Sequence, residues 1–303
     1  MVIVRGSRPG RRWTRLAHGL YVRADEPDDL GTRLRAWSLL LPESAVFTSL
    51  TAAALRGWWL PARLPQPVFA AVAASAPHPQ RPGLALTRLR RDPDGEELCG
   101  VRVATAPETL LAAARDLTVL DLVPLADSAL RLGDCTVAEL AATAAARRRG
   151  APALRRVLPL LDPRSESAWE SVLRVLHRAA GIEVEPQHEI RDAYGRFVAR
   201  ADLWLVGTRR IHEYDGEVHR GLAVHRRDLD RDRRLVETGW QRCGYTAGEV
   251  LRQGPRIIAS ADAVLGRRWQ PERARAWQAL VADSLYAPAG RARVAARWAS
   301  SNC

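Results

Sequence analysis

The chain has 303 residues, of which 47% are hydrophobic, and a formal net charge of +12. This length is sufficient for two domains with buried cores, and the hydrophobic content excludes a disordered protein. All 46 basic residues are arginine, a side chain that pairs with phosphate through two hydrogen bonds and stacks on bases. The composition therefore favours a nucleic-acid partner, although a GC-rich genome also replaces lysine by arginine.

The cysteines are few and scattered, at positions 99, 135, 243 and 303. Their spacing matches neither a zinc site nor a disulfide framework, so we expect a reduced, cytoplasmic protein. The first residues lack the apolar segment of a signal peptide, and no apolar run reaches the length of a membrane span. We therefore expect no membrane association.

Short elements follow one another through the first 150 residues. Residues 11–24 predict a β-hairpin with Gly19 near its bend, and its alternating arginines and aromatics suit either a phosphate backbone or an ordinary amphipathic surface. Residues 29–40 and 49–59 have a helical period. The proline-rich segment 66–105 predicts strands of a small sheet, and residues 106–149 predict further helices.

A glycine- and proline-rich stretch from Arg147 to Arg164 predicts a domain boundary near Asp162. The next helix begins at Ser167, which together with Glu170 forms a capping box. This box would account for Glu170 without any catalytic role.

Residues 200–219 predict a β-hairpin that turns at Gly207 and Thr208. Strand alternation places Glu213 and Asp215 on one face, and Asp202 on the facing strand lies near the level of Glu213. Three carboxylates this close raise one another's pKa and suit a hard cation such as Mg²⁺ or Mn²⁺. A purely structural interpretation remains open, in which Asp202 ends a strand, Asp215 lies in a turn and Glu213 pairs with an arginine.

Charged residues of both signs dominate the segment 223–237, at spacings of three and four that stabilise an exposed helix. This helix is either a solvated charged face or a phosphate-binding surface that uses Arg226, Arg227 and Arg231. Gly239 ends it, and Gln241 to Thr246 predict another strand. The order helix, strand, strand, helix, strand from 165 to 250 is typical of an α/β fold.

Five pieces of this region together resemble the DUF559 group. They are Ser167 to Arg174, Ala201-Asp202-Leu203, Glu213-Tyr-Asp215-Gly216-Glu-Val-His219, Arg227-Asp228 to Asp232, and Gly239-Trp240. That group is similar to the very-short-patch-repair endonucleases and belongs to the PD-(D/E)XK restriction-endonuclease-like superfamily. The resemblance covers residues 160 to 265.

The resemblance implies a role for each matching residue. Asp202, Glu213 and Asp215 would hold Mg²⁺ or Mn²⁺, with Asp215 in the position where the superfamily's motif has lysine. Glu170 would assist from its helix, and His219 would approach the scissile phosphate. The implied chemistry is metal-assisted hydrolysis of a phosphodiester bond.

The first 150 residues resemble the AbiEi family of type IV antitoxins. The matching pieces are Arg15 to Val22, Ala45 to Gly57 and Val103 to Leu110. Of that family's winged helix-turn-helix we expect only the wing here, because too few residues precede Trp13 to hold the helices.

The sequence thus predicts a mixed α/β (α+β) protein in three parts. Residues 1–155 are the antitoxin-like region with a winged-helix remnant, residues 160–268 the nuclease-like domain, and residues 269–303 a helical tail of unknown role. The predicted function is a metal-dependent DNA endonuclease. A non-catalytic DNA-binding or antitoxin-type regulator with a degenerate nuclease fold is the alternative, and a structural protein with a basic surface is a third. DNA is the expected partner, and a homodimer and a toxin or repair partner remain open.

Overall fold

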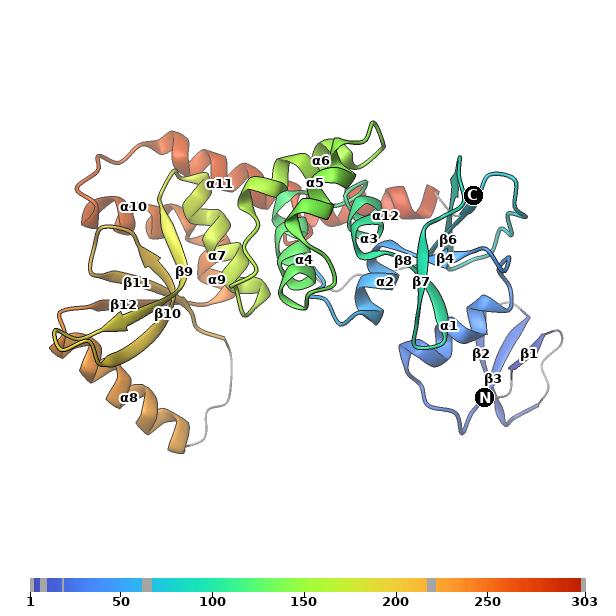
Figure 1. The fold of residues 1–303 in the computed structure, drawn as a ribbon, viewed down its shortest axis with the longest axis horizontal. Coiled ribbons are helices and arrows are strands. Elements are labelled where there is room, and N and C mark those ends of the chain that lie inside the picture. Colours follow the sequence, from blue (N-terminus) through green and yellow to red (C-terminus); the bar gives the residue numbers. More distant parts are fainter. Residues whose placement is uncertain (1–2, 6–9, 18, 62–66, 217–221, 301–303) are drawn as a thin grey trace. The chain divides into compact units, whose positions relative to one another are not determined.

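The computed structural model describes residues 3–5, 10–17, 19–61, 67–216 and 222–300 (Figure 1). The chain divides into two compact units. Unit 1 contains residues 1–117, 135–155 and 290–303, and unit 2 contains residues 118–134 and 156–289. The described residues form helices and three sheets with mixed strand directions, so the protein is of the mixed α/β class.

The first sheet of unit 1 contains the predicted N-terminal hairpin. Its strands are β1 (Ile3–Arg5), β2 (Trp13–Ala17) and β3 (Leu20–Arg23), in the antiparallel order β1-β3-β2. Gly19 precedes β3 with a φ of 70°, a left-handed conformation that glycine adopts without steric cost. The following helix α1 (Leu30–Ser38) begins at Asp29, whose carboxylate accepts a hydrogen bond from the Thr32 N–H at 2.6 Å.

The second sheet of unit 1 has the strand order β6-β5-β4-β8-β7. Its strands are β4 (Val46–Phe47), β5 (Val68–Ala73), β6 (Leu84–Leu89), β7 (Gly95–Leu98) and β8 (Val101–Ala104). Besides α1, the helices of this unit include α2 (Ser49–Leu55), α3 (Ala106–Ala113), α5 (Val137–Ala145) and most of α12 (Pro288–Ser300). Phe47 and Val103 pair between β4 and β8 and are both buried in the core that this sheet shares with α1.

The sheet of unit 2 is built from β9 (Val184–Arg191), β10 (Phe197–Leu205), β11 (Arg210–Tyr214) and β12 (Gln241–Tyr245). Its order is β12-β11-β10-β9, with β11 and β12 parallel and the other pairs antiparallel. Helix α7 (Ala168–Ala179) and helix α8 (Leu222–Glu237) cover opposite faces. The alternation along β11 shows this, because His212 contacts α7 and Glu213 contacts α8.

The remaining helices of unit 2 pack around α7. They are α4 (Val119–Arg131), α9 (Ala247–Arg252), α10 (Gly254–Val264) and α11 (Pro271–Asp283). The short helix α6 (Ala151–Val157) crosses the division between the units, and a 3₁₀ turn, Leu158–Leu160, follows it. None of the helices in the described ranges combines the length and the apolar character that a membrane crossing requires.

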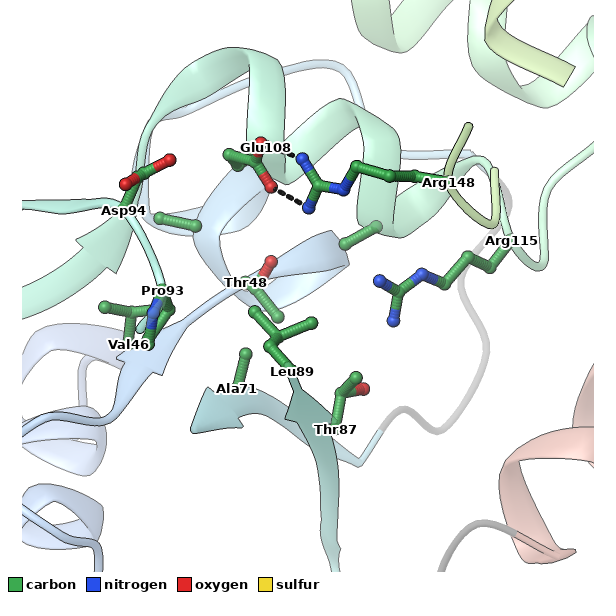
Figure 2. A pocket seen from close by; sticks show the side chains of 12 residues that line it. Val46, Thr48, Ala71, Thr87, Leu89, Pro93, Asp94, Glu108, Arg115 and Arg148 are labelled. Carbon is green, nitrogen blue, oxygen red and sulfur yellow. Dashed lines mark hydrogen bonds and ion pairs between the residues drawn. The ribbon is translucent and has the colours of Figure 1, made fainter. Parts of the chain in front are cut away.

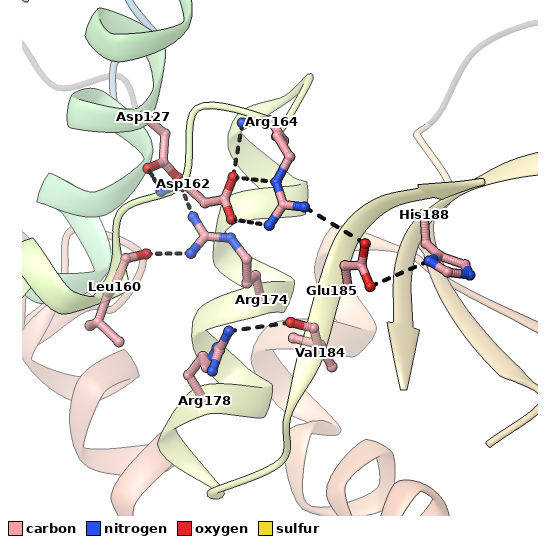
Figure 3. A network of polar contacts seen from close by, with 9 residues as sticks. All are labelled: Asp127, Leu160, Asp162, Arg164, Arg174, Arg178, Val184, Glu185 and His188. Atoms are coloured by element: carbon pink, nitrogen blue, oxygen red, sulfur yellow. Dashed lines mark hydrogen bonds and ion pairs between the residues drawn. The ribbon is translucent and has the colours of Figure 1, made fainter. Parts of the chain in front are cut away.

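A buried ion pair joins α4 to α7 (Figure 3). The Asp127 carboxylate accepts hydrogen bonds from the Arg174 guanidinium, from the Ser171 hydroxyl at 2.6 Å and from the Asp162 N–H at 2.8 Å. Arg174 also donates to the Leu160 carbonyl. Burial raises the pKa of Asp127 to about 6, against the attraction of Arg174. Because both oxygens are used, this acid has a complete structural role.

The domain organisation differs from the prediction in two places. Residues 118–134 lie in unit 2, because α4 packs on α7 through the pair just described. The segment 269–303 is not a separate tail, since α11 contacts α4, α7 and α10 whereas residues 290–303 lie in unit 1. The elements from 165 to 250 also include strand β9, which the predicted order omitted.

Candidate functional site

The predicted hairpin forms from β10 and β11, and its register places the acids as expected. Leu203 pairs with His212 and Trp204 with Ile211, so Asp202 lies one step further along, opposite Glu213. The Tyr214 N–H donates to Asp202 Oδ2 at 2.9 Å. Glu213 is buried, with 3% of its surface exposed. Two carboxylates therefore face each other across neighbouring strands.

Glu170 approaches this pair from the first turn of α7. The Ser167 hydroxyl accepts from the Glu170 N–H at 3.2 Å, which is half of the predicted capping box. The Glu170 carboxylate does not complete the box: its Oε2 accepts from the Glu166 N–H and from Gln187 Nε2, both at 2.8 Å. The capping box therefore does not account for the buried Glu170 side chain, which is held against strand β9.

Gln187 was not predicted to belong to the site. The β9–β10 register runs through Ala201 with His188 and Leu203 with Pro186, so Gln187 is the residue opposite Asp202. Its φ is 55°, a left-handed conformation that costs a non-glycine residue about 1 kcal/mol or more. This strained backbone aims an amide at Glu170 beside Asp202.

The three acids affect one another electrostatically. Burial and the charges of Glu170 and Glu213 together raise the pKa of Asp202 to about 7, against the opposing effects of the Tyr214 N–H and Arg231. Burial likewise raises the pKa of Glu170, with the Glu166 charge acting in the same direction. Among the residues that the structure describes, Asp202 accepts only the Tyr214 N–H, through Oδ2, whereas the Ser167 hydroxyl also lowers the pKa of Glu170. The site thus has excess negative charge and unused acceptors.

Two arginines neutralise the other side of the cluster. The Arg231 guanidinium, from α8, donates to both oxygens of Glu213 and, at 3.0 Å, to the Arg200 carbonyl. Arg242, on β12, bridges Glu213 at 2.5 Å and Asp215.

Asp215 lies just beyond the end of β11, and its N–H donates to the Tyr245 carbonyl at 2.9 Å. Its carboxylate occupies the space that a side chain at Gly244 would fill, because a Cβ there would lie 1.8 Å from Asp215 Oδ2. Glycine at this strand position is therefore what allows the acid to approach Arg242.

Some predicted site residues cannot be placed. His219 lies outside the described residues, and the side chains of Arg226 and Arg227 are not described either. Arg231, which was a candidate for phosphate contact, instead donates hydrogen bonds to the Glu213 carboxylate. Among the described residues no group of three acidic, histidine or cysteine side chains lies close enough to hold a metal ion, so the predicted ligand set of Asp202, Glu213 and Asp215 is not assembled.

A second polar chain occupies the opposite face of β11. His177 contacts the Leu173 carbonyl at 2.7 Å through Nδ1 and His212 at 2.9 Å through Nε2, and Tyr245 reaches His212 Nε2 at 3.4 Å. Burial lowers the pKa of His177 to about 4 and lowers that of His212 strongly. If His177 Nδ1–H donates to the carbonyl, His177 Nε2 accepts from His212 Nδ1–H, and His212 Nε2 accepts from the Tyr245 hydroxyl. Both histidines are then neutral and structural.

Sequence comparison identifies two similar proteins, both from Mycobacterium tuberculosis. These are the uncharacterized protein MT2308 of strain CDC 1551 / Oshkosh and the uncharacterized protein Rv2248 of strain ATCC 25618 / H37Rv. Each is 33% identical to this chain over 261 residues, which is 84% of this chain and 92% of the relative. The chain belongs to the family of these mycobacterial proteins. No family model and no solved structure matches it.

Three residues that complete the acidic site were not predicted from the sequence. Gln187 and Arg242 lie on strands whose sequence does not distinguish them from other polar positions, and Gly244 has a functional reason only beside Asp215. Alternation of Val184, Pro186 and Ile190 with polar residues could have predicted β9, and with it the position of Gln187.

Proposed function

We propose that unit 2 is a metal-dependent DNA endonuclease whose site is formed by Glu170, Asp202 and Glu213. The observation that carries the proposal is that Asp202 and Glu213 lie opposite each other in the sheet with the charge of Glu170 nearby, so that burial and these two carboxylates raise the pKa of Asp202 to about 7. Uncompensated buried acids are costly to stability, and they cluster where a protein binds a cation or transfers a proton. The paired Asp127 carries no comparable excess charge.

The donor set fits Mg²⁺ or Mn²⁺ only in part. Asp202 and Glu170 each have an oxygen available, and carboxylate oxygen is the ligand that these cations prefer. Glu213 and Asp215 are already paired with Arg231 and Arg242, so they would join only if those arginines moved. A bound cation would supply charge stabilisation and an activated water for phosphodiester hydrolysis.

Residues around the acids would bind the substrate phosphate and orient the carboxylates. An arginine displaced from Glu213 retains a guanidinium beside the acids, suited to a phosphate oxygen. The Gln187 amide fixes the orientation of Glu170. Trp169 and Tyr214, the sequence neighbours of Glu170 and Glu213, stack with their ring centres 5.7 Å apart.

A groove elsewhere on unit 2 suits a nucleic-acid strand. It lies between the β9–β10 turn and the C-terminal part of α8, and four arginines and three aromatic residues line it: Arg191, Arg196, Arg209, Arg234, Tyr194, Phe197 and Trp240. Tyr194 and Phe197 are 84% and 54% exposed, respectively. Guanidinium groups with exposed rings are the usual partners of phosphates and unstacked bases.

The deciding experiment is cleavage of supercoiled plasmid DNA by the full chain, with Mg²⁺ or Mn²⁺ and with EDTA. We expect nicked or linear product only with the cation, and none from Asp202→Asn. The Asp92→Asn variant removes an exposed acid of the same type in unit 1, outside the groove and the acidic site, and should cleave like the wild type. Cleavage by Asp202→Asn at the wild-type rate would contradict the assignment of the site.

The second candidate is a DNA-binding regulator with a degenerate nuclease fold. The observation that favours it is the pairing of Glu213 and Asp215 with arginines, which occupies both oxygens of Glu213 and one oxygen of Asp215. This candidate predicts duplex binding without cleavage. Affinity would fall with salt, and Arg196→Ala or Arg234→Ala would each reduce the slope of log affinity against log salt by about 1. Metal-dependent cleavage lost in Asp202→Asn would exclude it.

A further inference from the structure

A cavity in unit 1 lies between the second sheet and α3 (Figure 2). Its volume accessible to the centre of a water molecule is about 20 Å³, and it is partly open to solvent, so only a compact group fits inside it. Its apolar wall comes from the strands, with Val46, Ala71 and Leu89. Thr48 and Thr87 add hydroxyl groups, so the wall offers hydrogen-bonding partners as well as apolar contact.

Two carboxylates also line the cavity, and both are already neutralised. Arg148 donates two hydrogen bonds to the Glu108 carboxylate, drawn as dashed lines in Figure 2. One of them is 2.6 Å long. Arg91 lies 3.0 Å from Asp94 and 3.2 Å from Glu108. The acids of the cavity are therefore already paired with cations, and an additional cation there has no ion-pair partner among them.

Arg115 is that additional cation. It follows α3, and Figure 2 shows its side chain extending toward Thr48, Leu89 and Thr87. The guanidinium makes no hydrogen bond or ion pair within the described parts of the chain, and its Nε is buried without a partner. Burial lowers the pKa of Arg115, and the positive charges of Arg148 and Arg149 act in the same direction, against the weaker attraction of Asp116 and Glu108. A half-buried charge with unused donors destabilises the ligand-free protein.

The backbone around Arg115 keeps its side chain in place. Gly150 has a φ of 93°, and a Cβ there would lie 2.3 Å from the Leu111 carbonyl oxygen and 3.4 Å from Arg115 Cγ. The glycine thus lets this loop close over the stem of the arginine. A guanidinium held at the mouth of a partly apolar cavity needs little reorganisation to receive an anion.

We propose that this cavity binds a small organic anion whose phosphate or carboxylate group pairs with Arg115 and whose compact apolar part lies against Leu89 and Ala71. The planar fork of the guanidinium matches two oxygens of either group. Thr48 and Thr87 supply hydroxyl groups to the remaining oxygens. The site lies in unit 1, so it neither depends on the proposed nuclease activity nor fails with it.

Calorimetric titration of the full chain at constant ionic strength tests the proposal. The probes are inorganic phosphate and methylphosphonate on one side, and acetate and isobutyrate on the other, with chloride as the reference. We expect saturable binding of one pair, which distinguishes a phosphate-bearing from a carboxylate-bearing ligand. Arg115→Met should weaken that binding at least tenfold, whereas Arg147→Met, at an exposed position in the loop before Gly150, should change it less than twofold.

The melting temperature without any probe gives a second readout. Arg115→Met and Arg115→Gln should melt at or above the wild-type temperature, because they remove an unpaired charge. A lower melting temperature in both variants would show that Arg115 supports the fold, and would overturn the proposal. So would the absence of saturable binding by all four probes, or equal affinity in Arg115→Met and Arg147→Met.

Discussion

Two acids in unit 2, the buried Asp127 and the partly buried Asp202, differ in how the protein compensates their charge. Burial raises the pKa of both, to about 6 for Asp127 and to about 7 for Asp202. Asp127 has a guanidinium, a hydroxyl and a backbone N–H as partners, whereas Asp202 has one backbone N–H and two like charges nearby. A raised pKa alone therefore does not identify a functional acid, and the unsatisfied surroundings of Asp202 make the distinction.

The largest expected effect tests the structural side of this comparison. Arg174→Met leaves Asp127 buried without its cation, and we expect it to lower the free energy of unfolding by about 3–5 kcal/mol at neutral pH. Arg178→Met, on an exposed position of the same helix, should cost less than about 1 kcal/mol. Urea denaturation of the full chain measures both. Equal losses in the two variants would mean that the Asp127–Arg174 pair contributes nothing special.

The next effect concerns Asp202 and pH. A carboxyl whose pKa is about 7 when folded and 3.8 when unfolded favours folding fully below pH 3.8, and this contribution is lost as the pH rises through 7. Asp202→Asn removes the dependence. Its unfolding free energy should therefore exceed that of the wild type by an amount that grows from pH 4 to pH 8, to on the order of 3 kcal/mol.

Asp127→Asn provides the contrast, because it leaves the Arg174 charge buried and should be less stable than the wild type at neutral pH. Unfolding free energies at pH 4, 6 and 8 measure the two variants side by side. If Asp202→Asn were destabilised at pH 8 as strongly as Asp127→Asn, the two acids would have the same structural role.

Metal addition should have a smaller effect on stability, and this effect should depend on Asp202. A cation that binds only the folded protein stabilises it by about 2.7 kcal/mol at a hundredfold excess over Kd. We expect Mn²⁺ to raise the melting temperature of the wild type, and of Arg178→Met, relative to matched sodium chloride. Asp202→Asn should lose most of this gain. Identical responses of the wild type and Asp202→Asn to Mn²⁺ would exclude the metal site and favour the regulator.

The smallest effect tests the strained residue beside Asp202. Gln187→Ala loses the hydrogen bond to Glu170 and keeps the left-handed backbone, whereas Gln187→Gly loses the same bond but relieves the strain. We expect the glycine variant to be more stable than the alanine variant by about 1 kcal/mol. Thermal unfolding compares them directly. The reverse order would contradict the left-handed conformation at this position.

The local part of this fold could be predicted from the sequence. Residues 11–24 and 200–216 contain the expected hairpins, and the helices predicted at 29–40 and 49–59 form as Leu30–Ser38 and Ser49–Leu55, the second ending four residues early. The facing positions of Asp202 and Glu213 also followed from alternation and a short turn. These features depend on neighbouring residues and on the periods of helix and strand, which a single sequence displays.

Only the tertiary structure decided which partners the acids have. Arg231 and Arg242 come from α8 and β12, and nothing in the local sequence selects them, out of 46 arginines, as the partners of Glu213. The side chain of Glu170 fits a capping box by sequence, yet packing turns it toward Gln187. Likewise, residues 118–134 join unit 2 through the buried Asp127–Arg174 pair. Such pairings depend on the packing of distant segments and on the cost of burying unpaired charges, which local patterns do not record.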